Sequence, residues 1–316
     1  MAQLRYTPMD QNVVSISQDI RDMKIRGAGR IARAGATAVC RFAEGYTGTD
    51  MAAFGRELDE AVKVILDSRP TAVSLWNGVH ASIKGAKDAS SVEEAKDILI
   101  RNSNEFIAES NEAVQNIARI GAKRIEDGDV IMTHCNSSVA IGVIAEAHRQ
   151  GKDIKVYATE SRPWRQGILT VNDLSKEGID TTLIIDSAVR LVMKKVDKVF
   201  VGADTITSHG ALVNKIGTSQ VALAAKEARV QFYTCSETYK FSPLTLEGDL
   251  VKIEEREISE VVRPGEIPDS VRVYNPVFDV TPSQYIDGIV TELGLISPGS
   301  VYDILVKKFG TELMKE

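Results

Sequence analysis

The sequence has few of the residues that build disulfide frameworks or metal centres. Its three cysteines, Cys40, Cys135 and Cys235, are far apart and odd in number. Its four histidines show no spacing typical of metal ligands. We therefore expect neither a disulfide framework nor a metal site.

Long hydrophobic runs are also missing. No run of about eighteen apolar residues is present, and the N-terminal segment MAQLRYTPMD does not have the pattern of a signal peptide. We expect a cytoplasmic protein that does not enter a membrane. The net charge of −6 and the pI near 5.5 argue against nucleic acid as the main partner. Any anion site should therefore be local.

A chain of 316 residues is long enough for two domains. Residues 1–127 show helical periodicity, and we expect an α-helical N-terminal domain there. From residue 128 to residue 316, short Val- and Ile-rich strands alternate with helical stretches, which is typical of a Rossmann-like parallel sheet. The expected strands are Val130–His134, Ile154–Thr159, Thr182–Ile185, Lys198–Gly202 and Val230–Thr234. The expected helices between them are Ser138–Gln150, Arg165–Glu177, Ser187–Lys195 and Thr218–Glu227.

Cys135 follows the first of these strands and precedes a predicted helix. The N–H groups of a helix N-terminus favour a thiolate and can also bind phosphate oxygens. Ser137 and Ser138 lie in the same turn and could bind an anion. The alternative is a small apolar residue packed at the end of a strand.

Other polar residues follow the remaining strands, and ligands of a parallel sheet bind at the carboxyl ends of its strands. Asp204 comes after a Gly-Ala pair, so we expect it to face the same cleft as Cys135. Asn214 and Lys215 precede a helix, and Lys240 follows the fifth strand. Asp204 could instead cap a turn, and the two lysines could be solvated surface charges.

A second candidate phosphate site lies in the helical region, where Arg26, Gly27, Ala28 and Gly29 precede a helix. These glycines could also simply end the preceding helix. Arg69 is a further candidate, because a guanidinium group binds phosphate through two hydrogen bonds. If both sets of residues bind ligand, the substrate has two anionic ends.

Six ordered motifs resemble one superfamily over nearly the whole chain. Its members are archaeal ribose-1,5-bisphosphate isomerase, methylthioribose-1-phosphate isomerase and the α, β and δ subunits of initiation factor 2B. The motifs are Arg26-Gly-Ala-Gly29, Arg69-Pro-Thr71, Thr133-His-Cys-Asn-Ser137, Glu160-Ser-Arg-Pro163, Gly202-Ala-Asp204 and Asn214-Lys-Ile-Gly217. The motif His-Cys-Asn-Ser and the chain length are more similar to ribose-1,5-bisphosphate isomerase than to the other members.

The resemblance implies an isomerase in which Cys135 and Asp204 are catalytic. It also implies a set of substrate-binding residues, namely Arg26, Gly27, Ala28, Gly29, Arg69, Ser137, Ser138, Asn214, Lys215 and Lys240. It further implies a homo-oligomer, dimeric or hexameric. It also implies a role in AMP breakdown, with AMP as an activator. The chemistry requires no metal or organic cofactor. The alternatives are a methylthioribose-1-phosphate isomerase and a non-catalytic regulatory subunit that binds an initiation factor.

Overall fold

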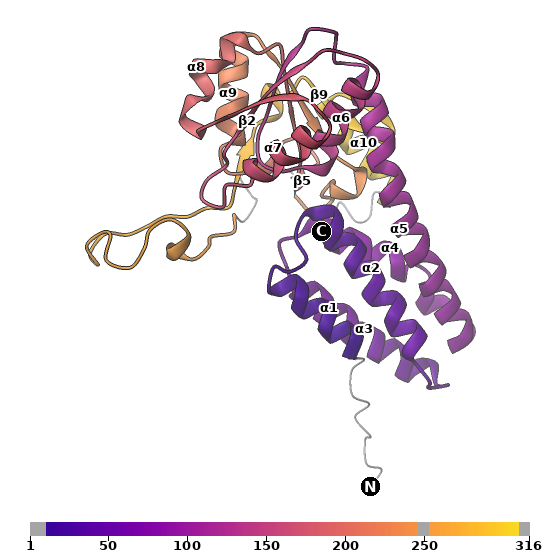
Figure 1. The fold of residues 1–316 in the computed structure, drawn as a ribbon. Coiled ribbons are helices and arrows are strands. Elements are labelled where there is room, and N and C mark those ends of the chain that lie inside the picture. Colours follow the sequence, from indigo (N-terminus) through magenta and orange to yellow (C-terminus); the bar gives the residue numbers. More distant parts are fainter. Residues whose placement is uncertain (1–10, 246–252, 310–316) are drawn as a thin grey trace. The chain divides into compact units, whose positions relative to one another are not determined.

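The computed structural model describes residues 11–245 and 253–309. The chain forms two compact units, residues 1–112 and residues 113–316. The division falls inside one long helix, α5 (Val92–Ala122). By secondary structure, the helical region continues beyond this division to the end of α5 (Figure 1).

The first unit is built from helices that pack their apolar faces together. They are α1 (Gln11–Arg21), α2 (Ala28–Gly45), α3 (Met51–Asp67), α4 (Val73–Ile83) and the first part of α5. Their core includes Phe54, Leu58, Ile65, Leu75 and Leu99, each at most 1% exposed. This arrangement confirms the predicted helical N-terminal region, because apolar residues at helical spacing bury one face of each helix.

The second unit contains a seven-stranded sheet in the order β10-β9-β7-β4-β1-β2-β3. The strands are β1 (Val130–Thr133), β2 (Lys155–Thr159), β3 (Asp180–Ile184), β4 (Lys198–Val201), β7 (Gln231–Cys235), β9 (Gly288–Thr291) and β10 (Gly294–Ile296). All neighbouring strands are parallel except β9 and β10. The predicted parallel sheet is confirmed.

Alternate residues of the central strands enter different cores. Met132, Val199 and Phe232 pack with the helices α8 (Val189–Val192), α9 (Thr218–Ala228) and α10 (Val301–Phe309). Their neighbours Ile131 and Phe200 pack with the end of α5 and with α6 (Ser138–Arg149), a core that also includes Leu174 of α7 (Gly167–Lys176). Because both faces are covered, the strands are apolar throughout rather than alternating with polar residues.

Three short strands form a separate antiparallel sheet that the sequence analysis did not predict. They are β5 (Thr205–Ile206), β6 (Leu212–Lys215) and β8 (Phe278–Thr281), in the order β5-β6-β8. Runs of two to four residues carry too little periodicity to be recognised. This sheet matters for the site because Asp204 lies immediately before β5 and Lys215 ends β6.

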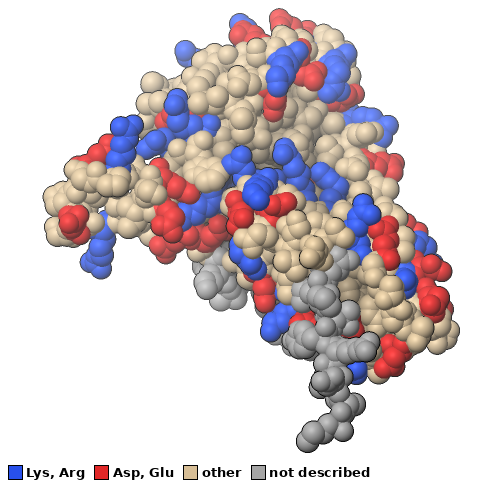
Figure 2. Space-filling model, turned by 60° about the horizontal axis from the view of Figure 1, so that its bottom comes forward, with Lys and Arg blue, Asp and Glu red and all other residues tan. Residues whose placement is uncertain are grey.

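No helix among the described residues is long and apolar enough to cross a membrane. On the face shown in Figure 2, Lys and Arg side chains lie among Asp and Glu side chains. This distribution agrees with the small net negative charge of the chain.

Candidate functional site

Cys135 and Asp204 follow two neighbouring strands at the point where the strand order reverses. After β1 the chain continues outward to β2 and β3, whereas β4 and β7 lie on the other side of β1. Strands β1 and β4 are directly paired. Cys135 follows β1 and Asp204 follows β4, so both residues lie at the crevice where open parallel sheets bind ligands.

The backbone of Cys135 is held in an unusual conformation by two hydrogen bonds. Its φ angle is 69°, in the left-handed region that residues other than glycine rarely adopt. Its N–H donates to the Ser161 hydroxyl at 2.8 Å, and its carbonyl accepts from the Thr170 hydroxyl at 2.7 Å. Such strain persists only where the surroundings fix it, and it clusters at functional sites.

A buried hydrogen-bond chain behind Cys135 contains His134. The Nε2 atom of His134 lies 2.8 Å from the Ile216 carbonyl, which can only accept, so Nε2 carries the proton. Its Nδ1 atom then accepts from the Thr159 hydroxyl at 2.6 Å, and Thr159 lies 3.2 Å from the Ser161 hydroxyl. Burial lowers the pKa of His134, which keeps the ring neutral. These hydrogen bonds therefore connect the Cys135 backbone to the backbone of Ile216, next to Lys215.

Ser161 is itself held by the loop that follows β3. The backbone N–H groups of Ser161 and Arg162 both donate to the Asp186 carboxylate at 2.8 Å. Ser161 also has a positive φ angle of 58°. The turns after β1, β2 and β3 are thus joined by hydrogen bonds around Cys135.

Burial opposes a thiolate at Cys135. The residue is only half-buried by surface area, yet desolvation raises the pKa of its thiol to about 11. The positive charge of Lys215 opposes this rise, whereas the negative charge of Asp204 adds to it. Desolvation therefore acts against the thiolate that the sequence analysis expected from the helix N-terminus.

Lys215 connects the two candidate catalytic residues electrostatically. Burial lowers the pKa of Lys215, while the charges of Cys135 and Asp204 raise it. Its Nζ atom lies 5.2 Å from the centre of the Phe278 ring. All three titratable groups thus act on one another, as the sequence analysis expected for residues that face one cleft.

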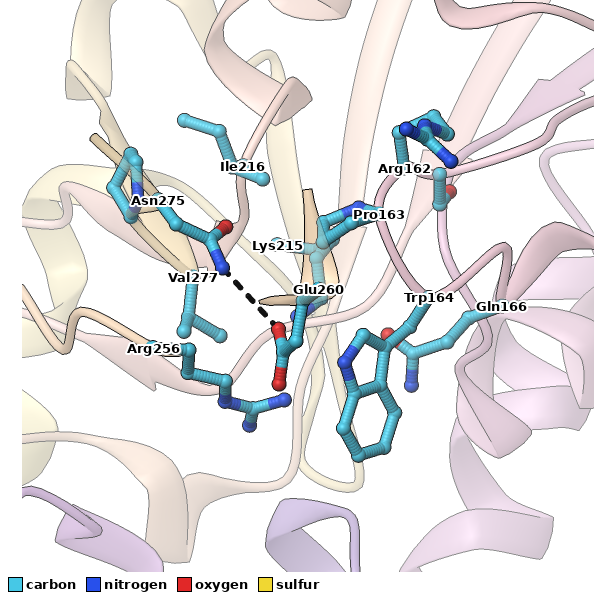
Figure 3. Close-up of a pocket in the computed structure, with 12 residues that line it drawn as sticks. Arg162, Pro163, Trp164, Gln166, Lys215, Ile216, Arg256, Glu260, Asn275 and Val277 are labelled. Atoms are coloured by element: carbon cyan, nitrogen blue, oxygen red, sulfur yellow. Dashed lines mark hydrogen bonds between the residues drawn. The ribbon is translucent and has the colours of Figure 1, made fainter. Parts of the chain in front are cut away.

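A pocket in the second unit is lined by residues that also contact or act on Cys135 (Figure 3). Gln166 and Lys215 both line it, and Gln166 accepts a hydrogen bond from the Cys135 Sγ at 3.4 Å. The Arg256 guanidinium, which also lines the pocket, lies over the Trp164 ring at 4.9 Å from its centre. The Asn275 amide donates to Glu260 at 3.3 Å, the bond drawn in Figure 3. The pocket therefore combines positive charge and hydrogen-bond donors, and one of its side chains, Gln166, contacts the Cys135 sulfur.

The predicted anion-binding residues near α6 and α9 have structural partners. Ser137 caps α6, with its hydroxyl accepting from the Ala140 N–H at 3.4 Å. The Asn214 amide donates to the Thr218 hydroxyl at 3.0 Å. Asp279 accepts from the Gly217 N–H at 2.7 Å and from the Ser219 hydroxyl at 2.8 Å. The N-terminus of α9 therefore already has a carboxylate. Ser138, the first residue of α6, is exposed.

Lys240 lies in a buried ion pair. Its Nζ atom is 2.7 Å from Glu237, and the side chains are only 6% and 2% exposed. Although burial alone would raise the pKa of Glu237, Lys240 holds it below the ordinary value. The Tyr239 hydroxyl also donates to Glu237, at 2.9 Å. This lysine is therefore fixed rather than mobile.

The remaining candidates, Arg26, Gly27, Ala28, Gly29 and Arg69, belong to the first unit. Gly27 has a φ angle of 88° and precedes α2, whose N-terminus has no side-chain cap. Arg26 is exposed, and the Arg69 guanidinium lies 2.9 Å from the Met23 sulfur. The structure thus places Arg69 close to the segment that leads into Arg26.

Sequence reasoning missed His134, Thr159, Gln166 and Asp186 as parts of the site. Three of them lie at the ends of β1, β2 and β3, so a search of every strand end would have found them. Gln166 gives no such signal, because its approach to Cys135 depends on the packing of α7. Among the described residues, no group of three or more His, Cys, Asp or Glu side chains could hold a metal ion.

The chain was compared with known protein families, proteins and structures. The model of the initiation factor 2 subunit family matches residues 24–298. The sequence is 50% identical to the ribose 1,5-bisphosphate isomerase of Archaeoglobus fulgidus, over 95% of this chain and 94% of that protein. It is also 50% identical to the isomerase of the same name from Methanocaldococcus jannaschii, over 93% of this chain and 94% of that protein. The crystal structure of the Pyrococcus horikoshii translation initiation factor eIF-2B is similar, with a TM-score of 0.77 and 35% identity over 91% of this chain and 98% of that one.

Proposed function

We propose that the chain, which belongs to the initiation factor 2 subunit family, converts α-D-ribose 1,5-bisphosphate to D-ribulose 1,5-bisphosphate. The two isomerases to which it is similar carry this activity in their names. The observation that carries the proposal is the placement of Cys135 and Asp204 at neighbouring strand ends, where both interact electrostatically with Lys215, a residue that lines a pocket. A thiol and a carboxyl group in one crevice suit the proton transfers of an aldose-ketose isomerisation.

Ring opening comes first, because C1 of the substrate carries a phosphate and offers no free aldehyde. In this proposal, protonated Asp204 donates its proton to the ring oxygen as the bond from C1 to that oxygen breaks. The Cys135 thiolate removes the proton from C2 and leaves a cis-phosphoenolate. The Cys135 thiol then returns a proton to C1 while the C2 hydroxyl gives its proton to the Asp204 carboxylate, so that C2 becomes the ketone of ribulose 1,5-bisphosphate and both residues regain their starting protonation states. The reaction needs no oxidant, since substrate and product are isomers.

The high pKa of the Cys135 thiol bears on the first of these steps. The pair of Cys135 and Asp204 can hold one proton in two ways, as thiol with carboxylate or as thiolate with carboxylic acid. The mechanism uses the second form. Because the Asp204 charge raises the pKa of Cys135, protonation of Asp204 removes that opposition and leaves Lys215 to favour the thiolate.

Substrate binding is assigned to the residues that the resemblance indicates. In the second unit these are Ser137, Ser138, Asn214, Lys215 and Lys240. In the first unit they are Arg26, Gly27, Ala28, Gly29 and Arg69, which we propose to bind a phosphate group. We further propose that the protein acts in the cytoplasm as a homo-oligomer, dimeric or hexameric, and that AMP from nucleotide breakdown activates it.

The decisive experiment is an isomerase assay on α-ribose 1,5-bisphosphate, with and without AMP, run beside methylthioribose 1-phosphate. The wild-type protein should convert the bisphosphate alone. Cys135→Ser and Asp204→Asn should each lower kcat by about 10²–10⁴, with little change in KM. Cys40→Ala, which alters a cysteine of α2 in the first unit, is the control and should keep full activity.

The solved structure named as an initiation factor favours one rival, a regulatory subunit without activity. Absence of turnover on both sugars, together with tight binding of a nucleotide or an initiation-factor subunit, would establish that rival. Turnover of methylthioribose 1-phosphate alone would identify the other isomerase. Either result would overturn the proposal.

A further inference from the structure

Gln166 lies in hydrogen-bond contact with the thiol of Cys135. Its Oε1 atom accepts from Sγ at 3.4 Å, and the side chain also lines the pocket (Figure 3). It is half-buried and lies immediately before α7. It therefore contacts both the thiol and the pocket.

The chain is built so that Gln166 can reach the thiol. The next residue, Gly167, lies so close to β2 that a Cβ atom there would be 1.7 Å from the Thr159 carbonyl oxygen. The Gly167 N–H donates to the Glu160 carbonyl at 3.1 Å, which fixes the start of α7 against the end of β2. Thr170, one turn further along α7, holds the Cys135 carbonyl. The same helix thus positions both the backbone and the thiol of Cys135.

A primary amide is suited to a sulfur atom that changes its protonation state. A thiol donates a hydrogen bond and requires an acceptor, whereas a thiolate accepts and requires a donor. The Gln166 amide carries both an oxygen and an NH₂ group, and rotation about its last torsion exchanges them. A carboxylate at the same place could only accept, and a lysine could only donate.

We infer that Gln166 is a catalytic residue whose amide accepts from the Cys135 thiol and, after rotation, donates to the Cys135 thiolate that removes the C2 proton. This inference rests on the proposed isomerase function. Gln166 forms and breaks no covalent bond in the reaction. As the proton leaves sulfur, the bond from Sγ to the amide oxygen is replaced by a bond from the amide NH₂ group to the thiolate. The thiolate is thereby stabilised by a donor in a half-buried site.

Other charged groups also act on the Cys135 thiol. They are Lys215 from β6, Asp204 from the turn before β5 and Asp186 from the loop after β3. Neutral His134 lies behind the residue. None of these residues is altered when Gln166 is replaced. Gln166→Glu adds a negative charge beside the thiol, whereas Gln166→Met removes the amide without adding a charge, so the Met variant reports on the amide itself.

The test measures how fast iodoacetamide alkylates Cys135 in the full-length protein as pH is varied. The variants are Gln166→Glu, Gln166→Met and the control Gln231→Glu, and Cys135→Ala supplies the background from the other two cysteines. Gln166→Glu should move the alkylation midpoint upward by about one pH unit, which lowers the rate below that midpoint about tenfold. Gln166→Met should lower kcat about tenfold or more while KM changes little. Gln231→Glu should leave the midpoint unchanged, because Gln231 is exposed at the start of β7, whereas Cys135 follows the end of β1.

An unchanged midpoint in Gln166→Glu overturns the inference. So does a Gln166→Met enzyme with wild-type kcat, and in that case the proposed function stands. Failure of the wild-type protein to convert the bisphosphate overturns the proposed function, whereas the alkylation midpoints still show whether Gln166 controls the thiol. Circular dichroism of each variant separates these effects from a loss of folding.

Discussion

Replacing Gly167 by alanine tests whether the start of α7 sets the geometry of the site. A Cβ atom at this position would lie 1.7 Å from the Thr159 carbonyl oxygen and 2.8 Å from the Thr159 carbonyl carbon. Both contacts are with backbone, so no side-chain rotation relieves them. To restore van der Waals contact, the start of α7 must move away from β2 by roughly 1–2 Å. Gln166 and Thr170 would move with it.

The displacement should cost both stability and activity. Overpacking of this kind costs about 1–3 kcal/mol in the free energy of unfolding, and we expect the upper end because backbone must move. A shift of about 1 Å in a catalytic group can lower kcat about 100-fold. Gly142→Ala is the matched control, since Gly142 lies in α6 with Ala118 at 3.7 Å from the added Cβ, an ordinary contact. It should raise the free energy of unfolding by about 0.5–1 kcal/mol.

Urea unfolding followed by the fluorescence of Trp164 measures this effect in the second unit. The chain has two tryptophans, and Trp76→Phe in every variant leaves Trp164 as the only one. Gly142→Ala should unfold at a higher urea concentration than the parent protein, and Gly167→Ala should unfold at a lower one. If Gly167→Ala unfolds at the same urea concentration as Gly142→Ala and keeps its kcat within about twofold, the reasoning is wrong.

Two further predictions concern buried ionisable groups. Glu237→Gln removes the charged partner of the buried Lys240 cation and should lower the free energy of unfolding by about 3–5 kcal/mol in the same urea experiment. Glu227→Gln breaks an exposed ion pair with Arg190 and should barely change the free energy of unfolding. The pKa of buried His134 is lowered, so as pH falls the unfolded chain binds a proton at this residue before the folded protein does. The free energy of unfolding should therefore decrease below about pH 6.5, by at most about 1.4 kcal/mol per pH unit. In His134→Gln that slope should be smaller between pH 6.5 and 5, and an unchanged slope in the Trp164 signal would rule out this histidine as the cause.

The fold could be predicted from the sequence because its signals are local. Helical periodicity and apolar strands can be recognised in short runs of consecutive residues. The ends of the predicted strands then indicate where Cys135 and Asp204 lie. The short strands β5, β6 and β8 were missed because they have too few residues to show a period. Gln166 was missed for another reason. Its contact with Cys135 depends on the close approach of Gly167 to Thr159, which is a property of packing and not of any sequence pattern.

The charge of Cys135 depends on burial as well as on the local sequence. A helix N-terminus favours a thiolate by a partial charge, whereas desolvation, with a smaller contribution from Asp204, raises the pKa of the thiol to about 11. A thiol with a raised pKa reacts more slowly with alkylating and oxidising agents at neutral pH. In the proposed reaction, the proton on Asp204 and the donor offered by Gln166 then favour the thiolate together with Lys215. The carboxyl group of Asp204, the amide of Gln166 and the ammonium group of Lys215 thus all favour the Cys135 thiolate. Removing any one of them should raise the barrier to proton abstraction at C2.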